Sequence, residues 1–349
     1  MNAPMEQLPT MREYASMLVH TKSPVDHVWI SNTGSVTGSP DDWFAIRFGT
    51  ETGDQHWGLM PGPEFSPRLY RGQNKRYERT VASLFRLSSE TDWLVASTRL
   101  VEFGEHVLRH SGTAAISEME ILGLIGRVDW IAQGQHYGIP TEYVDVTRNR
   151  AVAEFFARCR PTVDTDPTQP WEVLPQKAYD AVLYTVDVKK LINSSDSEIV
   201  VPMGPSPLLR PYRQAAVGLR LKGTDFRSIP AVTEESLPYS RERAEELLDQ
   251  FDAGRLLFPK DAMSEIAREI LTSKTLTVDA VRTARRLTGR SLSLDEIGER
   301  LSRAGYRTVK NRRFLNDDRA ARLQEEWQEM APDYVSRIKW RGTAASYSP

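Results

Sequence analysis

The stretch QHYGIPTEYVDVTRNRAVAEFFA, residues 135–157, carries the most structural information in this chain. Gly138 and Pro140 predict a turn, and the run that follows them is typical of a short β-strand. Asn149 is a good helix N-cap, and apolar residues follow it at helical spacing. These residues are Ala151, Val152, Phe155 and Phe156. The stretch therefore predicts a turn, a strand and a helix in close succession.

Two polar residues, Asp145 and Thr147, come between the predicted strand and the predicted helix. We expect them on the turn before the helix, where unpaired backbone N–H groups and the positive end of the helix dipole suit anionic ligands. A plainer alternative is that Asp145 braces the turn and Thr147 supplies a second cap, since both residue types are common in turns.

A second informative segment is LYRGQ, residues 69–73, in which Arg71 directly precedes Gly72 at the end of a strand-like run. A guanidinium group offers a rigid fork that matches phosphate or carboxylate oxygens, and a glycine lets a ligand approach the backbone closely. Tyr70 could stack on a planar ring, and Gln73 could hydrogen-bond to that ring. The alternative is an exposed arginine that pairs with a carboxylate across the sheet.

The composition limits the class of protein. A chain of 349 residues can form one large domain with appendages, or two domains, and its net charge of −2 indicates no strong general attraction to nucleic acids or membranes. Cys159 is the only cysteine, which excludes an internal disulfide and a multi-cysteine metal site, and we expect no metal. The N-terminal residues do not resemble a secretory signal, and no apolar run approaches the roughly 20 residues that span a bilayer. We therefore expect a cytoplasmic protein with no membrane partner.

The chain divides into three predicted segments. Residues 1–54 contain two strand-like runs, HVWIS (27–31) and WFAIRF (43–48), which predict a hairpin or two edge strands packed on the core. Residues 55–275 form the predicted main domain and include AVLYTVDV (181–188), a candidate buried strand. Residues 276–349 are predicted to form a basic, helical C-terminal subdomain.

The two informative segments together resemble the FRG family, which is named for its (Phe/Tyr)-Arg-Gly motif. In that family an (F/Y)RGQ motif precedes an LxPSLxR-like run, here RTVASLFR ending at Arg86. A QHYGxPTRLLDWT-like run then leads into a helix, here Gln135 to Ala157, and an LFPDLxG-like close follows, here LLFPKDAMSEIA. The resemblance covers roughly residues 60–270.

The order of these motifs also resembles the ADP-ribosyltransferase fold of the Arg–Ser–Glu class. This resemblance implies an α+β protein with a split mixed or antiparallel sheet flanked by helices, closed by a helical C-terminal subdomain. It implies that NAD is the substrate, that Arg71 holds its phosphate or ribose, and that Thr147 orients the nicotinamide-side ribose. Gly72 would meet the nicotinamide amide through its backbone. The other residues implied to bind NAD are Tyr70, Gln73, His136, Tyr137, Thr141 and Gln214.

The group that completes such a site is the least defined part of the pattern. Cleavage of the nicotinamide–ribose bond builds positive charge on the ribose, and a nearby carboxylate or amide oxygen stabilises that charge. We expect Asp145 to be this group and hence catalytic together with Arg71 and Thr147, because its turn also presents Thr147. The alternatives are Gln214, Glu234 and Glu235. Glu142 is a departure from the family, which usually has an arginine at this position.

The C-terminal segment supports a separate hypothesis. LSLDEIGERLSRAGY contains a predicted capping box from Ser293 to Glu296, and Gly305 is a natural helix stop. Residues 282–322 hold twelve Lys or Arg and five Asp or Glu residues. Such a cluster could contact RNA or DNA phosphates or an acidic partner, and the alternative is a solvated charged face. The candidate contacts are Arg307, Lys310, Arg312 and Arg313.

Three functions agree with the sequence. The first is an NAD-dependent ADP-ribosyltransferase, by resemblance a bacterial toxin or anti-phage effector with a macromolecular target, RNA or DNA among the options, and a neutralising antitoxin as a candidate partner. The second is a non-catalytic module that senses a nucleotide, and the third is an interaction module whose basic C-terminal segment recognises the partner.

Overall fold

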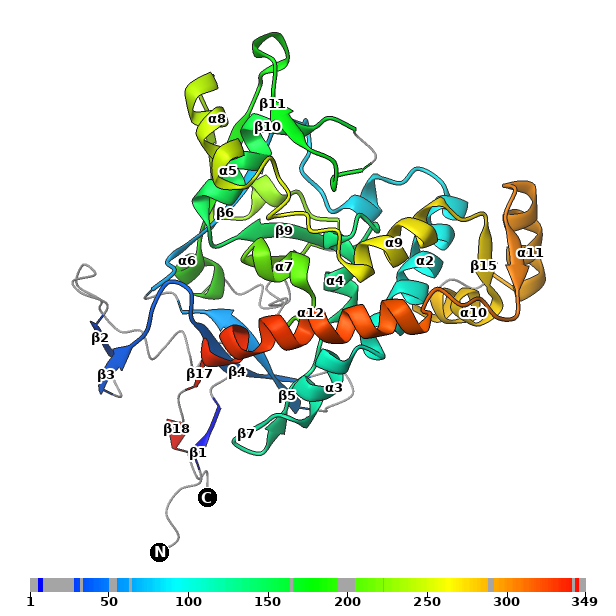
Figure 1. Ribbon diagram of the computed structural model, residues 1–349, viewed down its shortest axis with the longest axis horizontal. Helices are drawn as coiled ribbons and strands as arrows, with labels where there is room; N and C mark the ends of the chain where they lie inside the picture. The colour runs from blue at the N-terminus through cyan, green and yellow to red at the C-terminus, as the bar shows by residue number, and fades with distance from the viewer. Residues whose placement is uncertain are drawn as a thin grey trace, which may run out of the picture.

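A five-stranded antiparallel sheet lies at the centre of the computed structural model (Figure 1). The order of its strands is β13 (Ala216–Arg220), β9 (Tyr143–Thr147), β6 (Arg68–Gln73), β12 (Val182–Asp187) and β14 (Val232–Ser236). The structure describes residues 6–8, 28–31, 34–49, 55–62, 65–163, 166–193, 205–221, 223–287, 292–340 and 343–344.

The central sheet is split between β6 and β9. Strand β6 pairs with β12 at all six of its residues, and β9 pairs with β13 at all five of its residues. Between β6 and β9, however, the register contains the single pair Tyr70 and Thr147. Beyond this pair the two strands separate on the side of Arg71 and Asp145. The expected α+β class is confirmed, and this sheet is antiparallel rather than mixed.

Local sequence accounts for the central elements. The predicted strand at 181–188 is confirmed as β12, in which Val182, Leu183 and Tyr184 are completely buried. The predicted helix is α5 (Arg150–Arg158), and the Asn149 side chain accepts a hydrogen bond from the Ala151 N–H. An uninterrupted apolar run suits a strand that is buried on both faces, and a capped apolar periodicity suits a helix that packs on the sheet.

Helices surround the sheet. Along the chain they are α2 (Glu90–Leu108), α3 (Ser111–Glu118), α4 (Trp130–His136), α5, α6 (Val188–Asn193), α7 (Leu209–Arg213), α8 (Arg241–Gln250), α9 (Ala262–Thr272), α10 (Val278–Leu287), α11 (Leu294–Arg303) and α12 (Asp317–Ser336). Short 3-10 helices are η1 (Ser83–Arg86), η2 (Gln176–Ala178) and η3 (Phe226–Ser228). Figure 1 shows the long helix α12 crossing one side of the molecule, with α9, α2, α10 and α11 towards one end.

Smaller sheets lie around this core. They are formed by β1 (Glu6–Gln7) with β18 (Thr343–Ala344), β2 (Val28–Ser31) with β3 (Gly34–Thr37), β4 (Trp43–Gly49) with β5 (Gln55–Pro61) and β17 (Ile338–Trp340), β7 (Glu120–Ile121) with β8 (Leu124–Ile125), β10 (Cys159–Pro161) with β11 (Trp171–Val173), and β15 (Thr275–Thr277) with β16 (Arg307–Val309). Both strand-like runs of the N-terminal segment form strands, β2 and β4, but each pairs with a different strand rather than with the other.

Each of the three predicted segments contributes a strand to one small sheet. The boundary between residues 54 and 55 falls between β4 and β5, which pair with each other along their length. Strand β17, near the C-terminus, adds to the same sheet in parallel with β4. In the last segment the Ser293–Glu296 capping box forms, and Gly305 adopts a φ of 78°. Among the described helices, none combines the length and apolar character needed to cross a membrane.

Candidate functional site

A cavity of about 310 Å³ opens where β6 and β9 separate. Its volume is at the lower end of the range of about 300–1,000 Å³ that is usual for small-molecule sites. The residues that line it come from β6 and the loop after it, η1, α4, β9, α5, β10, β11, β13 and the segment before β13. Of the predicted site residues, it is lined by Tyr70, Arg71, Gly72, Gln73, His136, Asp145, Thr147 and Gln214.

Arg71 spans the gap between the two strands. Its Nη1 donates a hydrogen bond of 2.7 Å to the Asp145 carbonyl oxygen, and its Nε has no hydrogen-bond partner among the described residues. Burial lowers the pKa of the Arg71 guanidinium, and the nearby Asp145 carboxylate opposes this shift. Arginine stays protonated in proteins, so the cavity contains a partly desolvated cation with unused hydrogen-bonding capacity. Such a group binds phosphate or carboxylate oxygens well.

Arg86 also lines this cavity, at the end of η1. It contributes to lowering the pKa of Arg71, after burial, so the two positive charges lie close to each other. Within the described part of the chain, the Arg86 side chain makes no hydrogen bond or ion pair. In the sequence Arg86 ends a motif fifteen positions after Arg71, and nothing local indicates that the two side chains meet. The pair creates a local excess of positive charge.

Gly72 lines the cavity and also has a packing role. A Cβ atom at this position would lie 1.7 Å from the backbone oxygen of Ala153 and 3.0 Å from the backbone nitrogen of Ala157, both in α5. The absence of a side chain is therefore required for α5 to pack on β6. This packing requirement accounts for the glycine whether or not a ligand approaches it.

His136 and Asp145 meet on one wall of the cavity. The His136 ring is buried, and its Nε2 lies 3.3 Å from Oδ1 of Asp145. Its Nδ1 lies 2.9 Å from Oε1 of Gln214, whose Nε2 donates to the Leu257 carbonyl oxygen at 3.0 Å. Because that carbonyl can only accept, the amide orientation of Gln214 is determined, and His136 must carry its proton on Nδ1. Oδ1 of Asp145, which faces the ring, has no hydrogen-bond partner among the described residues.

Thr147 is buried and its hydroxyl is already engaged. The hydroxyl donates to the Gln214 carbonyl oxygen at 2.7 Å and accepts from the Asn149 N–H at 3.0 Å. This agrees with the alternative that Thr147 helps to cap the turn before α5. Thr147 and Asp145 lie within β9 rather than on the turn itself, and one lone pair of the hydroxyl is left for a ligand.

The remaining candidates lie in different places. Tyr137 lines a second, neighbouring cavity, whereas Thr141 is buried, hydrogen-bonds to Gln135 at 2.7 Å, and lines neither cavity. Glu234 and Glu235 project from the edge strand β14, where they pair with Arg76 and Arg150, and neither lines these two cavities. Glu142 pairs with Arg220 of β13 at 2.5 Å. Of the groups proposed to stabilise the positive charge on the ribose, Asp145 and Gln214 therefore border the cavity of Arg71.

Comparison with protein families identifies part of the chain. Residues 66–166 match the FRG domain. This match supports the FRG family, and it covers β6, η1 and β9, and with them Arg71, Arg86 and Asp145. Searches of curated proteins and of solved structures found no match.

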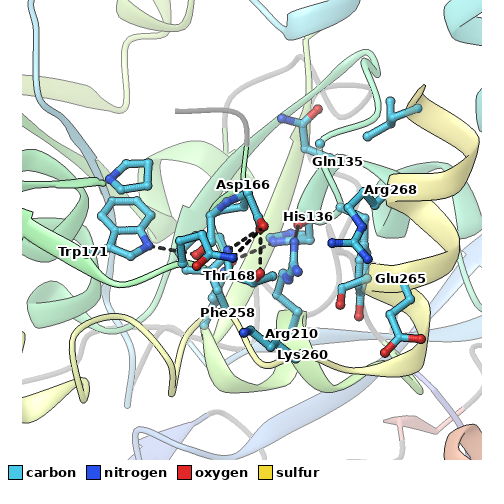
Figure 2. A pocket seen from close by; sticks show the side chains of 18 of the residues that line it. Gln135, His136, Asp166, Thr168, Trp171, Arg210, Phe258, Lys260, Glu265 and Arg268 are labelled. Carbon is cyan, nitrogen blue, oxygen red and sulfur yellow. Dashed lines mark hydrogen bonds between the residues drawn. The ribbon is translucent and has the colours of Figure 1, made fainter. Parts of the chain in front are cut away.

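The second cavity adjoins the FRG segment and is larger, about 730 Å³. It is lined by the end of α4, the loop before β11 and one side of α9 (Figure 2). Both cavities are lined by His136, Asp145, Phe156, Pro161, Trp171 and Gln214. The two cavities are therefore adjacent across one shared wall, with the His136–Asp145 pair on it.

The predicted basic contacts lie beyond the C-terminal end of the FRG match and divide into two kinds. Arg312 is partly buried, and it donates to the Thr275 carbonyl oxygen at 2.9 Å and contacts the Phe314 ring, which is a structural arrangement. Arg313 is exposed and lies 3.9 Å from Asp317. Arg307 and Lys310 are exposed. Among the described residues, no group of three or more His, Cys, Asp and Glu side chains is placed to hold a metal ion.

Proposed function

We propose that this protein transfers ADP-ribose from NAD to a macromolecular acceptor, in the cavity of Arg71. The observation that carries the proposal is the placement of two guanidinium groups, Arg71 and Arg86, and the Asp145 carboxylate around one cavity of about 310 Å³. Two neighbouring cations suit the diphosphate of a dinucleotide, and the carboxylate suits the positive charge that develops on the ribose. The FRG match over residues 66–166 agrees with the resemblance to the FRG family, whereas NAD is implied by the separate resemblance to the ADP-ribosyltransferase fold.

The reaction requires one bond to break and one to form. The bond between the nicotinamide nitrogen and ribose C1′ breaks, and its electron pair leaves with neutral nicotinamide. A lone pair on an acceptor N–H or O–H group forms the new bond to C1′, and the acceptor proton passes to the Asp145 carboxylate. Asp145 would also stabilise the positive charge on the ribose before the new bond forms, as a carboxylate does in glycoside cleavage.

His136 and Gln214 would act as positioning residues. Gln214 holds the His136 ring through Nδ1, and the ring presents Nε2 to Asp145 at 3.3 Å. The ring therefore packs beside the carboxylate and helps to fix the place of Asp145 on the cavity wall. Groups that hold a catalytic residue in place in this way affect turnover more than substrate affinity.

The experiment is incubation with NAD labelled in its adenylate phosphate, followed by measurement of nicotinamide release and of label transferred to macromolecules. Arg71→Ala and Asp145→Asn should each reduce nicotinamide release about 100- to 1,000-fold, the usual loss for one preorganised electrostatic contact. Arg76→Ala is a matched control, because Arg76 is exposed, pairs with Glu234 at 3.0 Å, and lines neither cavity. Equal activity of Arg71→Ala and Arg76→Ala would refute the proposal.

A second candidate is a nucleotide-sensing module without catalysis. It is favoured by the surroundings of Thr147, whose hydroxyl makes two hydrogen bonds within the protein, and by the placement of Glu234 and Glu235 away from the cavity. NAD binding that depends on Arg71, with no release of nicotinamide, would support this candidate. By family resemblance, the active enzyme would be a bacterial toxin or an anti-phage effector, and loss of viability on expression, relieved by Arg71→Ala, would test that role.

A further inference from the structure

Three positively charged side chains that form no ion pair among the described residues line the larger cavity, although the buried Asp261 carboxylate lies near the first of them, Arg210. They are Arg210 of α7, Lys260 before α9 and Arg268 of α9. Lys260 and Arg268 are exposed, and within the described residues neither side chain makes a hydrogen bond or an ion pair. Figure 2 shows Arg210 and Lys260 below His136, with Arg268 on the helix beside them.

Arg210 is the buried member of this group, with 3% of its surface exposed. Its Nη1 donates to the His136 carbonyl oxygen at 3.0 Å, and its Nε has no hydrogen-bond partner among the described residues. The guanidinium lies 4.6 Å from the centre of the Tyr137 ring and 5.3 Å from that of Phe258. Flanking rings hold the guanidinium in place, so its unused donors are preorganised for an anion at the cavity wall.

The carboxylates around the cavity are already engaged. Asp166 accepts hydrogen bonds from Thr168 and Gln169 within its own turn. Glu265 accepts from Arg322 at 2.9 Å and lies 3.6 Å from Arg319, both on α12. Asp145 faces His136 across the shared wall. Arg268 lies close enough to Asp166 to lower the pKa of that carboxyl, but it forms no ion pair with it among the described residues. The charge of Lys260, and most of that of Arg268, is therefore left for a ligand.

An aromatic pair lines the same cavity. Trp171 and Phe258 are stacked with ring centroids 5.1 Å apart and an interplanar angle of 16°. Trp171 is half-buried and also lines the cavity of Arg71. Aromatic rings next to cations bind a nucleotide through stacking of the base and pairing with the phosphate.

Further cations continue outward from this cavity. Thr272 is the last residue of α9 and lines the cavity, and Lys274 follows it by two positions. The next strand, β15, pairs with β16, with Thr275 opposite Arg307, and Lys310 follows directly. Lys274, Arg307 and Lys310 are exposed. A chain of phosphates leaving the cavity past Thr272 would therefore meet positive charge.

We propose that the larger cavity binds a single-stranded nucleic acid, and that one nucleotide of this strand is the acceptor of ADP-ribose. The base lies against Trp171 and Phe258, its phosphate against Arg210, Lys260 and Arg268, and the adjoining backbone along Lys274 and Arg307. The acceptor role rests on the proposed function, and the binding of the strand does not. The shared wall brings the bound base next to Asp145, where its N–H or O–H group can be deprotonated during attack on C1′.

The alternative occupant of this cavity is the adenosine half of NAD itself. Two observations favour the strand. The diphosphate of NAD already has Arg71 and Arg86 in the smaller cavity. The cations of the larger cavity also extend beyond a single nucleotide, towards Lys274 and Arg307, which suits a polymer of phosphates.

The test measures strand binding and NAD turnover separately. A fluorescent single-stranded RNA of about 12 nucleotides, within the usual site sizes, is titrated with the full chain without NAD, at several salt concentrations. The double variant Lys260→Ala/Arg268→Ala should weaken binding at least tenfold. It should also lower the slope of log affinity against log salt by about 1.4, or 0.7 for each lost phosphate contact. Arg241→Ala/Arg255→Ala removes the same charge from exposed sites outside both cavities and should bind like the unaltered protein.

Nicotinamide release without RNA is measured on the same variants. Unaltered release by Lys260→Ala/Arg268→Ala, combined with lost RNA binding and lost label transfer to RNA, is the expected result. Loss of NAD binding in this variant would assign the cavity to the adenosine half and overturn the proposal. Unchanged RNA binding by the variant would also overturn it. So would polyglutamate that displaces the fluorescent RNA as well as unlabelled RNA does. RNA binding that depends on Lys260 and Arg268, without nicotinamide release by the unaltered protein, would refute the proposed function and the acceptor role while confirming the strand site.

Discussion

The substitution Gly72→Ala tests the packing that forms the site. The Cβ atom would lie 1.7 Å from the Ala153 backbone oxygen, and real Cβ atoms essentially never come within 3.0 Å of such an atom. Helix α5 would therefore have to move by roughly 1.3 Å, since a backbone carbonyl within a helix cannot rotate away by itself. The movement would also displace Val152 and Phe156, which line the cavity.

Overpacking of a well-packed interior usually costs about 1–3 kcal/mol, and collision with a backbone atom places Gly72→Ala at or above the upper end. We expect the free energy of unfolding to fall by about 3 kcal/mol. Urea unfolding followed by circular dichroism measures this as a lower midpoint with an unchanged slope. The loss should be present in the absence of any ligand, because it arises from contacts within the protein.

Gly298→Ala provides a matched control with the opposite expected sign. Gly298 is in α11, and a Cβ atom there would meet nothing within 4 Å. Replacing an exposed helical glycine by alanine should raise the free energy of unfolding by about 0.5–1 kcal/mol. If Gly72→Ala unfolded at the same urea concentration as the unaltered protein, α5 would not pack on β6 as described, and the geometry of the cavity would be wrong.

Two further predictions concern buried polar groups. Gln214→Leu removes the hydrogen-bond partner of the His136 Nδ1–H and of the Leu257 carbonyl, so the free energy of unfolding in urea should fall by about 2–4 kcal/mol. The substitution should also lower the turnover of NAD more than the apparent affinity for NAD. Unchanged turnover would exclude a positioning role for Gln214. Burial lowers the pKa of both His106 and His110 from 6.5 to about 4. As the pH drops from 6.5 towards 4, these histidines take up protons in the unfolded chain but not in the folded one, so stability falls. His110→Asn keeps a hydrogen-bond acceptor for the Gly112 N–H, which donates to the His110 ring in the folded protein. The substitution should reduce the loss of stability between pH 7 and pH 5 by about 2 kcal/mol. An unchanged pH dependence would contradict this account.

Several features could be predicted from short stretches of sequence. Asn149 caps α5, the Ser293–Glu296 capping box starts α11, and Gly305 ends it with a positive φ. These features depend on groups within four or five residues of one another, so their chemistry can be read directly from the order of residues. The partners of strands β2 and β4, which are β3 and β5, could not be predicted in this way. Strand partners are selected by contacts across the fold.

The sequence by itself determined the α+β class, the main strands and helices around the FRG motifs, and the residue types that suit an anionic ligand. Only the tertiary structure decided which of these residues share a cavity. It brought Arg86 beside Arg71, used the Thr147 hydroxyl for the turn, and assigned Gly72 to the packing of α5. The physical reason is that the single pairing of Tyr70 with Thr147, seventy-seven positions apart, sets where β6 and β9 separate, and no local pattern encodes that register.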